Sequence, residues 1–216
     1  MVIACLLPGV SLAAGHADIS GPTLVQIYNT PELKAQAVEA GEPLFQQHCS
    51  SCHAADGTGS PGVPDISTGI FMWGGSLSDL EVTIRYGIRS GHEFQRYSEM
   101  PAYTDQDFLS KERINDLVEY VLSIAYQDAD KSAVDRAAGD FEQICSECHD
   151  YAGTGRKEYY GAPDLTDFSW QYGNSRETLF DTIAKGRKGV SPAFDQALDN
   201  EAIKDLTVYI YDKSHY

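Results

Sequence analysis

The pattern Cys-x-x-Cys-His occurs twice in this chain of 216 residues, at 49–53 and at 145–149. Two thiols at this spacing can each bond one vinyl group of the same porphyrin, and the histidine that follows can ligate its iron. One match could be a thiol redox pair, but both copies share the same surrounding pattern. The sequence therefore predicts two covalent haem c groups. Their attachment and ligand residues are Cys49, Cys52 and His53 for the first haem and Cys145, Cys148 and His149 for the second.

The two motifs belong to an internal repeat that covers most of the chain. Val63-Pro64-Asp65-Ile66 corresponds to Ala162-Pro163-Asp164-Leu165, and Trp73 corresponds to Trp170. A repeat of this kind indicates one duplicated domain, and a haem supplies apolar bulk that so short a domain lacks. The predicted divisions are an export signal at 1–17, an extension with a helix at 18–40, the first domain at 41–126, a linker at 127–131 and the second domain at 132–216.

Helical patterns account for the expected regular structure. Apolar residues recur at three- and four-residue spacing over 114–125, after Ser110, which is a favourable N-cap. Pro31 suits the first turn of an earlier helix, and Gly41 and Pro43 are expected to break or bend that helix. The predicted fold class is all-α, with two small helical domains that each surround one haem.

The beginning of the chain has the character of an export signal. Residues 2–14 are largely apolar, too few to span a bilayer, and are followed by small residues. No Lys or Arg precedes Lys34, so the basic leading region of such a signal is missing. Because covalent haem attachment is typically completed outside the cytoplasmic membrane, we predict a periplasmic protein, either soluble or peripherally attached to a membrane.

The formal net charge is −16. A charge of this sign disfavours nucleic acid and anionic lipid surfaces, and it favours redox partners with a basic docking face. It is equally compatible with a role in solubility alone.

The sixth iron ligand decides what a haem can do, because a thioether raises the reduction potential and suits electron transfer. Met100, on the loop before the last helix of the first domain, is the predicted sixth ligand of the first haem. Met72, next to Trp73, is expected to pack in the core. The position that corresponds to Met100 in the second half is Ser191, whose neutral hydroxyl is a poor iron ligand.

The second haem is therefore expected to be weakly or incompletely ligated, with Ser191 marking a vacant distal position. It would be five-coordinate, bound by water, or ligated by a side chain from elsewhere in the chain. The candidates for such an imported ligand are Lys188, His92 and His215.

Both halves resemble class I cytochromes c, and the tandem resembles the periplasmic dihaem cytochrome c subunit of cbb3-type haem-copper oxidases. The resemblance covers about residues 41–213 and is carried by Trp73-Gly74-Gly75, 83–89, 96–101 and 161–167. That family has a transmembrane helix ahead of its first haem domain and a methionine at the position of Ser191. In this sequence no segment ahead of the first domain is expected to form such a helix, and Ser191 replaces the methionine.

The resemblance also implies roles for residues around the haems. The backbone carbonyls of Pro64 and Pro163 would orient the proximal imidazoles. Arg85 and Arg187 would contact haem propionates.

Two functions remain open. The first is single-electron transfer without catalytic residues, as an electron-transfer protein or as a subunit that delivers electrons to a respiratory terminal oxidase or reductase. The alternative is a haem enzyme or gas-binding sensor that uses the open coordination site of the second haem. Electron transfer is favoured because haem catalysis needs polar groups arranged above the iron, and no pattern indicates them.

Overall fold

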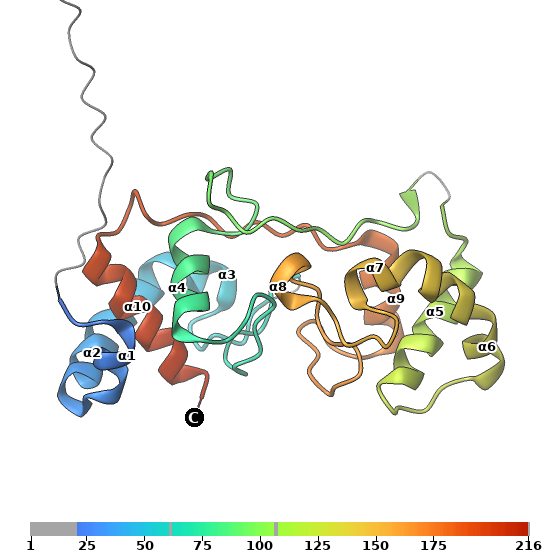
Figure 1. Ribbon diagram of the computed structural model, residues 1–216, viewed down its shortest axis with the longest axis horizontal. Coiled ribbons are helices and arrows are strands. Elements are labelled where there is room, and N and C mark those ends of the chain that lie inside the picture. Colours follow the sequence, from blue (N-terminus) through green and yellow to red (C-terminus); the bar gives the residue numbers. More distant parts are fainter. Residues whose placement is uncertain (1–20, 61, 106–107, 216) are drawn as a thin grey trace, which may run out of the picture.

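The computed structural model describes residues 21–60, 62–105 and 108–215, so the predicted export signal at 1–17 lies outside it. Within these ranges the regular structure is helical, as predicted, and extended backbone forms only isolated bridges (Figure 1). None of the helices described is long and apolar enough for a membrane span. The elements are α1 (Leu24–Asn29), α2 (Pro31–His48), α3 (Ser50–His53), α4 (Leu77–Tyr86), α5 (Lys111–Ile124), α6 (Lys131–Asp140), the π-helix η2 (Phe141–Cys145), α7 (Ser146–His149), α8 (Lys157–Tyr160), α9 (Arg176–Lys185) and α10 (Asn200–Lys213).

Side-chain caps explain where five of the longer helices begin, whereas α2 begins with Pro31 in its first turn and has no side-chain cap. An N-cap oxygen accepts a backbone hydrogen bond in each of five helices, which satisfies a donor that the first turn leaves free. The N-cap residues are Ser76, Ser110, Asp130, Ser175 and Asp199. Ser76 and Asp79 also form a reciprocal capping box at the start of α4.

Helix α2 runs through Gly41 and Pro43 without the predicted break. A Cβ atom at Gly41 would lie 2.4 Å from the Asp205 carbonyl oxygen and 2.6 Å from the Tyr209 Cβ. The missing side chain therefore lets α10 cross α2 at close range. Tertiary packing along α2 outweighs the hydrogen bond that Pro43 removes.

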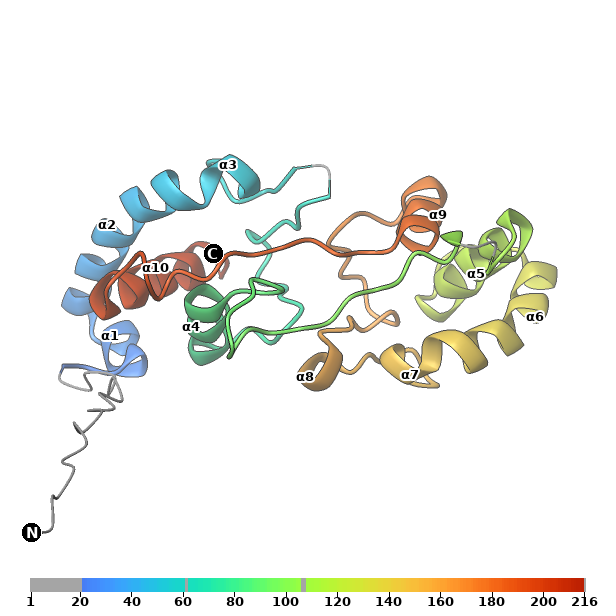
Figure 2. The same ribbon diagram turned by 90° about the horizontal axis from the view of Figure 1, so that it is seen from above.

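Helices α5 and α10 are exchanged between the two halves. Helix α10 packs against α2 and α4, and α5 packs against α6 and α9. Figures 1 and 2 show α10 beside α1 and α2 at one end of the molecule and α5 beside α6 at the other. Sequence order had predicted that α5 would complete the domain at 41–126 and α10 the domain at 132–216. We call 21–97 with 189–215 the first unit, and 98–188 the second unit.

The exchanged helices are reached through two chain segments that are paired by backbone hydrogen bonds. The segment after α4 and the segment after α9 run side by side along the molecule (Figure 2). Ile88 and Ser191 exchange two backbone hydrogen bonds of 3.0 Å, and Met100 and Arg187 exchange two of 3.1 and 2.9 Å. The second unit is consequently a continuous middle part of the chain, whereas the first unit is assembled from segments on either side of it.

Equivalent aromatic pairs mark the cores of the two units. Phe45 on α2 lies against Tyr209 on α10, with ring centroids 5.5 Å apart, and Phe141 on η2 stacks on Tyr120 of α5 at 4.6 Å. Tyr120 and Tyr209 occupy corresponding positions in the repeat. Each phenylalanine therefore packs against the tyrosine of the other half of the sequence. Division of the chain into the predicted domains 41–126 and 132–216 would separate the two residues of each pair.

Candidate haem-binding sites

The cysteines of both motifs lie at corresponding places at the ends of α2 and η2 and on α3 and α7. Burial raises the pKa of the Cys49 thiol to about 11 and that of Cys145 to about 12. Cysteines of a redox-active Cys-x-x-Cys pair have a lowered pKa, because the thiolate is the reactive form. The environment of these thiols is therefore unlike that of a thiol redox pair.

Both motif histidines contact the proline carbonyl that the resemblance assigns to them. His53 Nδ1 lies 3.2 Å from the Pro64 oxygen, and His149 Nδ1 lies 3.1 Å from the Pro163 oxygen. Burial lowers the pKa of both imidazoles, which favours their neutral form. With the proton on Nδ1 donated to the carbonyl, Nε2 keeps a free lone pair that can ligate iron.

A glycine keeps each of these carbonyls in place. Gly155 has a φ of +76°, and a Cβ atom there would lie 2.5 Å from the Pro163 oxygen. Its backbone amide donates to the His149 carbonyl at 2.8 Å. Gly59 has the same role after the first motif, with a φ of +80°. Only glycine fits loops that bring histidine and proline together this closely.

A cavity of the second unit lies against Cys145, Cys148 and His149, and Met100 lines it. We predicted Met100 as the ligand opposite His53, but the structure places it with His149. The exchange is the physical reason, because the connection after α4 has already entered the second unit when it reaches Met100.

The residue that we predicted at the vacant distal position of the second haem also lies in the other unit. Ser191 pairs with Ile88, immediately after α4, so it lies in the first unit with His53. Met72, which we expected in a core, lines the same cavity of the second unit as Met100. Both methionines in the described part of the chain thus line the cavity of His149.

The side chains considered as imported ligands do not line this cavity. His92 Nε2 lies 3.2 Å from an Asp195 carboxylate oxygen, and its Nδ1 accepts a backbone hydrogen bond of 3.0 Å. His215 stacks on Tyr211 with ring centroids 4.1 Å apart. Lys188 is exposed to solvent.

Four buried side-chain nitrogens have no hydrogen-bond partner among the residues described. They are Nε1 of Trp73 and Trp170 and Nε of Arg96 and Arg187. A buried donor without an acceptor is costly, so these atoms indicate that a group with acceptor oxygens belongs beside them. Trp170 and Arg187 line the second cavity itself. Haem propionates are anionic acceptors, and the residues present therefore fit haem c.

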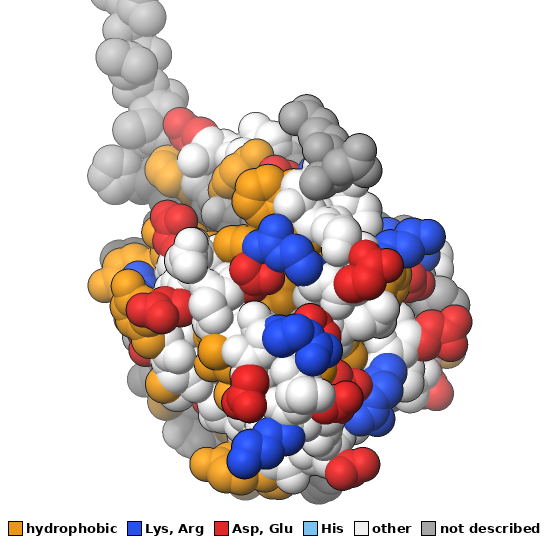
Figure 3. Space-filling view, turned by 90° about the vertical axis from the view of Figure 1, so that its right-hand side faces the viewer, with side chains coloured by type: hydrophobic (Ala, Val, Ile, Leu, Met, Phe, Trp, Pro, Cys, Tyr) orange, Lys and Arg blue, Asp and Glu red, His pale blue; other side chains and the backbone are white. Residues whose placement is uncertain are grey.

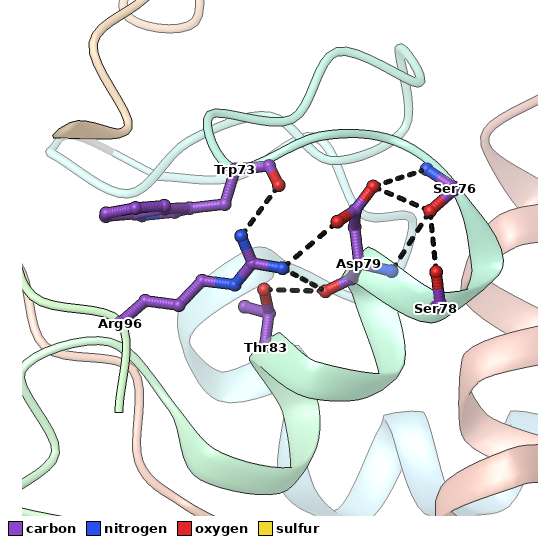
Figure 4. A network of polar contacts seen from close by, with 6 residues as sticks. All are labelled: Trp73, Ser76, Ser78, Asp79, Thr83 and Arg96. Atoms are coloured by element: carbon purple, nitrogen blue, oxygen red, sulfur yellow. Dashed lines mark hydrogen bonds and ion pairs between the residues drawn. The ribbon is translucent and has the colours of Figure 1, made fainter. Parts of the chain in front are cut away.

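Arg96 belongs to this set, and although 96–101 carry part of the family resemblance, the sequence predicted no role for its side chain. It donates to the Trp73 carbonyl at 2.8 Å and to Asp79 at 3.2 Å, and its guanidinium lies 5.4 Å from the indole centroid. Figure 4 shows how Asp79 also receives hydrogen bonds from Ser76 at the start of α4. This network fixes the Trp73 backbone against α4. Arg96 lies in a segment without a counterpart in the second half, so the repeat gave no signal for it.

The two arginines that we predicted to contact propionates differ from each other. Arg187 lies 4.1 Å above the Tyr172 ring and lines the second cavity, as a propionate partner would. Arg85 instead donates to Asn200 at 2.7 Å and to Glu81 at 2.8 Å. Its guanidinium therefore joins α4 to α10.

Charges alternate at the end of the molecule formed by α5 and α6, where Figure 3 shows acidic and basic side chains interspersed. Arg113 pairs with Asp140 at 2.5 Å, and Arg136 pairs with Asp116 at 2.6 Å, so these pairs connect α5 to α6. Two acidic side chains at this end are therefore each paired with an arginine.

Comparisons with known proteins agree with two haem sites. The family model described as "Cytochrome c" matches residues 38–125, and the model described as "Cytochrome C oxidase, cbb3-type, subunit III" matches 132–210. These matches support one c-type haem in each half.

Curated relatives match most of this chain. The chain is 35% identical over 189 residues to the cbb3-type cytochrome c oxidase subunit CcoP of Cereibacter sphaeroides, which covers 87% of this chain and 65% of the relative. It is 36% identical to subunit FixP of Azorhizobium caulinodans (92% and 67%) and 32% identical to CcoP of Azospirillum brasilense (90% and 68%). The chain thus spans about two thirds of the length of these relatives. Together with the two haem sites, this similarity shows that the chain belongs to the CcoP/FixP family, the dihaem cytochrome c subunits of cbb3-type oxidases.

Proposed function

We propose that this chain passes single electrons from an exported donor to the membrane part of a cbb3-type oxidase. The observation that carries the proposal is the repeated geometry of a half-buried histidine that follows two cysteines directly and lies against a proline carbonyl. Haem c supplies the one-electron chemistry when bound, and the protein tunes it through its ligands and their hydrogen bonds. Because the named relatives are subunits of cbb3-type oxidases, we place the chain at the periplasmic side of such a complex.

His149 and Met100 ligate the second haem in this proposal. Support comes from the position of Met100 in the cavity of His149 and from its paired backbone contacts with Arg187. A thioether opposite imidazole raises the reduction potential, which suits a centre that exchanges electrons. The net charge of −16 supports a donor with a basic docking face.

His53 holds the less completely ligated haem, because Ser191 occupies the position that a methionine would need in the first unit. This observation keeps the alternative function, a gas-binding or catalytic haem, but moves it from the second haem to the first. Electron transfer remains the favoured function because it needs no further polar group at the iron.

Spectroscopy of the dihaem protein tests the ligand assignment. In the ferric protein we expect the near-infrared absorption of a thioether-bound iron to disappear in Met100→Ala and to persist in Met72→Leu. After reduction, carbon monoxide should bind one haem per chain in the wild type and two in Met100→Ala. An absorption band that survives in Met100→Ala would contradict the assignment.

Electron delivery needs a second experiment. The prereduced protein is mixed with cbb3-type oxidase lacking this subunit, and oxidation of its haems is followed by stopped-flow absorbance. We expect oxidation that oxygen drives and that the oxidase requires. Haems that stay reduced in the presence of active oxidase would refute the proposed relay.

A further inference from the structure

The cavity of the second haem is partly formed by the first unit. Ile70, Phe71 and Met72 line it, although they belong to the loop before α4. Phe71 also packs against the core that contains Phe45 and Leu80. A single side chain therefore contacts both the core around the first haem site and the cavity of the second.

Specific contacts hold this loop against the second unit. Gln171 donates to the Ile70 carbonyl at 3.0 Å. Gly161, which ends α8, has a φ of +58°, and a Cβ atom there would lie 2.5 Å from the indole ring of Trp73. Trp73 is 8% exposed and carries one of the unpartnered buried nitrogens. The close approach of Gly161 thus seats the second unit directly on Trp73. Because Trp73 corresponds in the repeat to Trp170, which lines the cavity of the second haem, we assign Trp73 to the first haem site.

We propose that Phe71 and Gly161 are positioning residues that set the gap between the two haems and thereby the rate of electron transfer between them. The inference rests on the proposed relay. In the step concerned, one electron leaves a ferrous iron and arrives at a ferric iron of the same chain, with no bond formed and no proton moved. Tunnelling rates fall exponentially with the gap, so a small displacement at this contact has a large effect.

Two variants perturb the junction in different ways. Phe71→Leu removes the ring that bridges core and cavity, and Gly161→Ala forces the Trp73 indole away. The matched control for Phe71→Leu is Phe180→Leu, because Phe180 packs against the core of the second unit but does not line the cavity. The matched control for Gly161→Ala is Gly91→Ala. Gly91 has a φ of +86° and nothing within 4 Å of a built Cβ, so it carries the same backbone strain without the contact.

The measurement is intramolecular electron redistribution in the dihaem protein after pulse radiolysis that supplies less than one electron per chain. Redox titration of each variant gives both midpoint potentials, so a change in driving force is separated from a change in distance. We expect several-fold slower redistribution in Phe71→Leu and Gly161→Ala, with two haems per chain and rates like the wild type in both controls. Gly161→Ala should also shift the potential of the first haem, because Trp73 belongs to its site.

Unchanged redistribution in Phe71→Leu would overturn the inference, even if Gly161→Ala fails to fold. A slower rate explained entirely by the altered potentials would overturn it as well. Neither result would contradict the proposed electron delivery to the oxidase. That proposal is refuted only if the oxidase does not oxidise the haems of the wild-type protein.

Discussion

The exchanged packing of α5 and α10 predicts which aromatic residues are energetically coupled. Phe141 is 1% exposed and stacks on Tyr120 at 4.6 Å, with 29° between the ring planes. Such a pair contributes about 0.5–1.5 kcal/mol beyond the apolar area that it buries. A double-mutant cycle of Phe141→Leu and Tyr120→Leu should therefore give a coupling free energy of about 1 kcal/mol.

The matched cycle combines Phe141→Leu with Tyr209→Leu. Tyr209 is the partner that sequence order predicts for Phe141, but in the structure it lies against Phe45, at 5.5 Å. Mutations at sites without contact add to within about 0.5 kcal/mol, so this cycle should give no coupling above that limit. The two cycles share the variant Phe141→Leu and use the same residue types. The difference between their coupling free energies therefore shows whether α5 or α10 packs against Phe141.

The assay is guanidinium denaturation of the dihaem protein, followed by far-ultraviolet circular dichroism at a fixed pH and salt concentration. The free energies of unfolding of the wild type, the two single variants and the double variant in each cycle give the coupling. Coupling between Phe141 and Tyr209 together with its absence between Phe141 and Tyr120 would refute the exchange. In that case the units would follow sequence order.

Three further predictions concern single residues. Gly155→Ala should displace the Pro163 carbonyl and weaken the proximal hydrogen bond, which makes His149 a less basic ligand, so a raised potential of the second haem would reveal it; Gly139→Ala, with only Gln143 at 3.7 Å from its built Cβ, is the control. Burial raises the pKa of Asp205 to about 6, from 3.8 in an unperturbed chain. Between pH 3.8 and about 6 the folded state therefore binds more protons at this carboxyl than the unfolded state does. The free energy of unfolding should consequently fall as the pH rises through this range. Asp205→Asn should abolish this part of the decline in denaturation curves, and an identical pH profile would contradict the assignment. Arg96→Leu removes a positive charge and a buried donor from the first haem site, so redox titration should give a lower potential for that haem and leave the second unchanged.

Local features of the molecule could be predicted from residues close together in the sequence. The two motifs and the capping residues Ser110, Ser175 and Asp199 act over a few positions. The proline that follows each motif lies 11 or 14 positions after the motif histidine and is given by the family resemblance. The structure gives both histidines a hydrogen bond to the carbonyl named from the resemblance. The contacts of Arg96 with Trp73 and Asp79 bridge 23 and 17 positions, so no local pattern predicted them.

The sequence by itself determined that the chain would form two helical haem-binding halves, since the motif, the repeat and the apolar periodicity are local properties. It did not determine which last helix completes which half. Ile114, Leu117 and Val121 on α5 correspond to Ile203, Leu206 and Ile210 on α10, so both helices present the same apolar pattern to either groove. Only tertiary packing, through the two paired connections, assigned α5 and Met100 to the unit of His149 and α10 and Ser191 to the unit of His53.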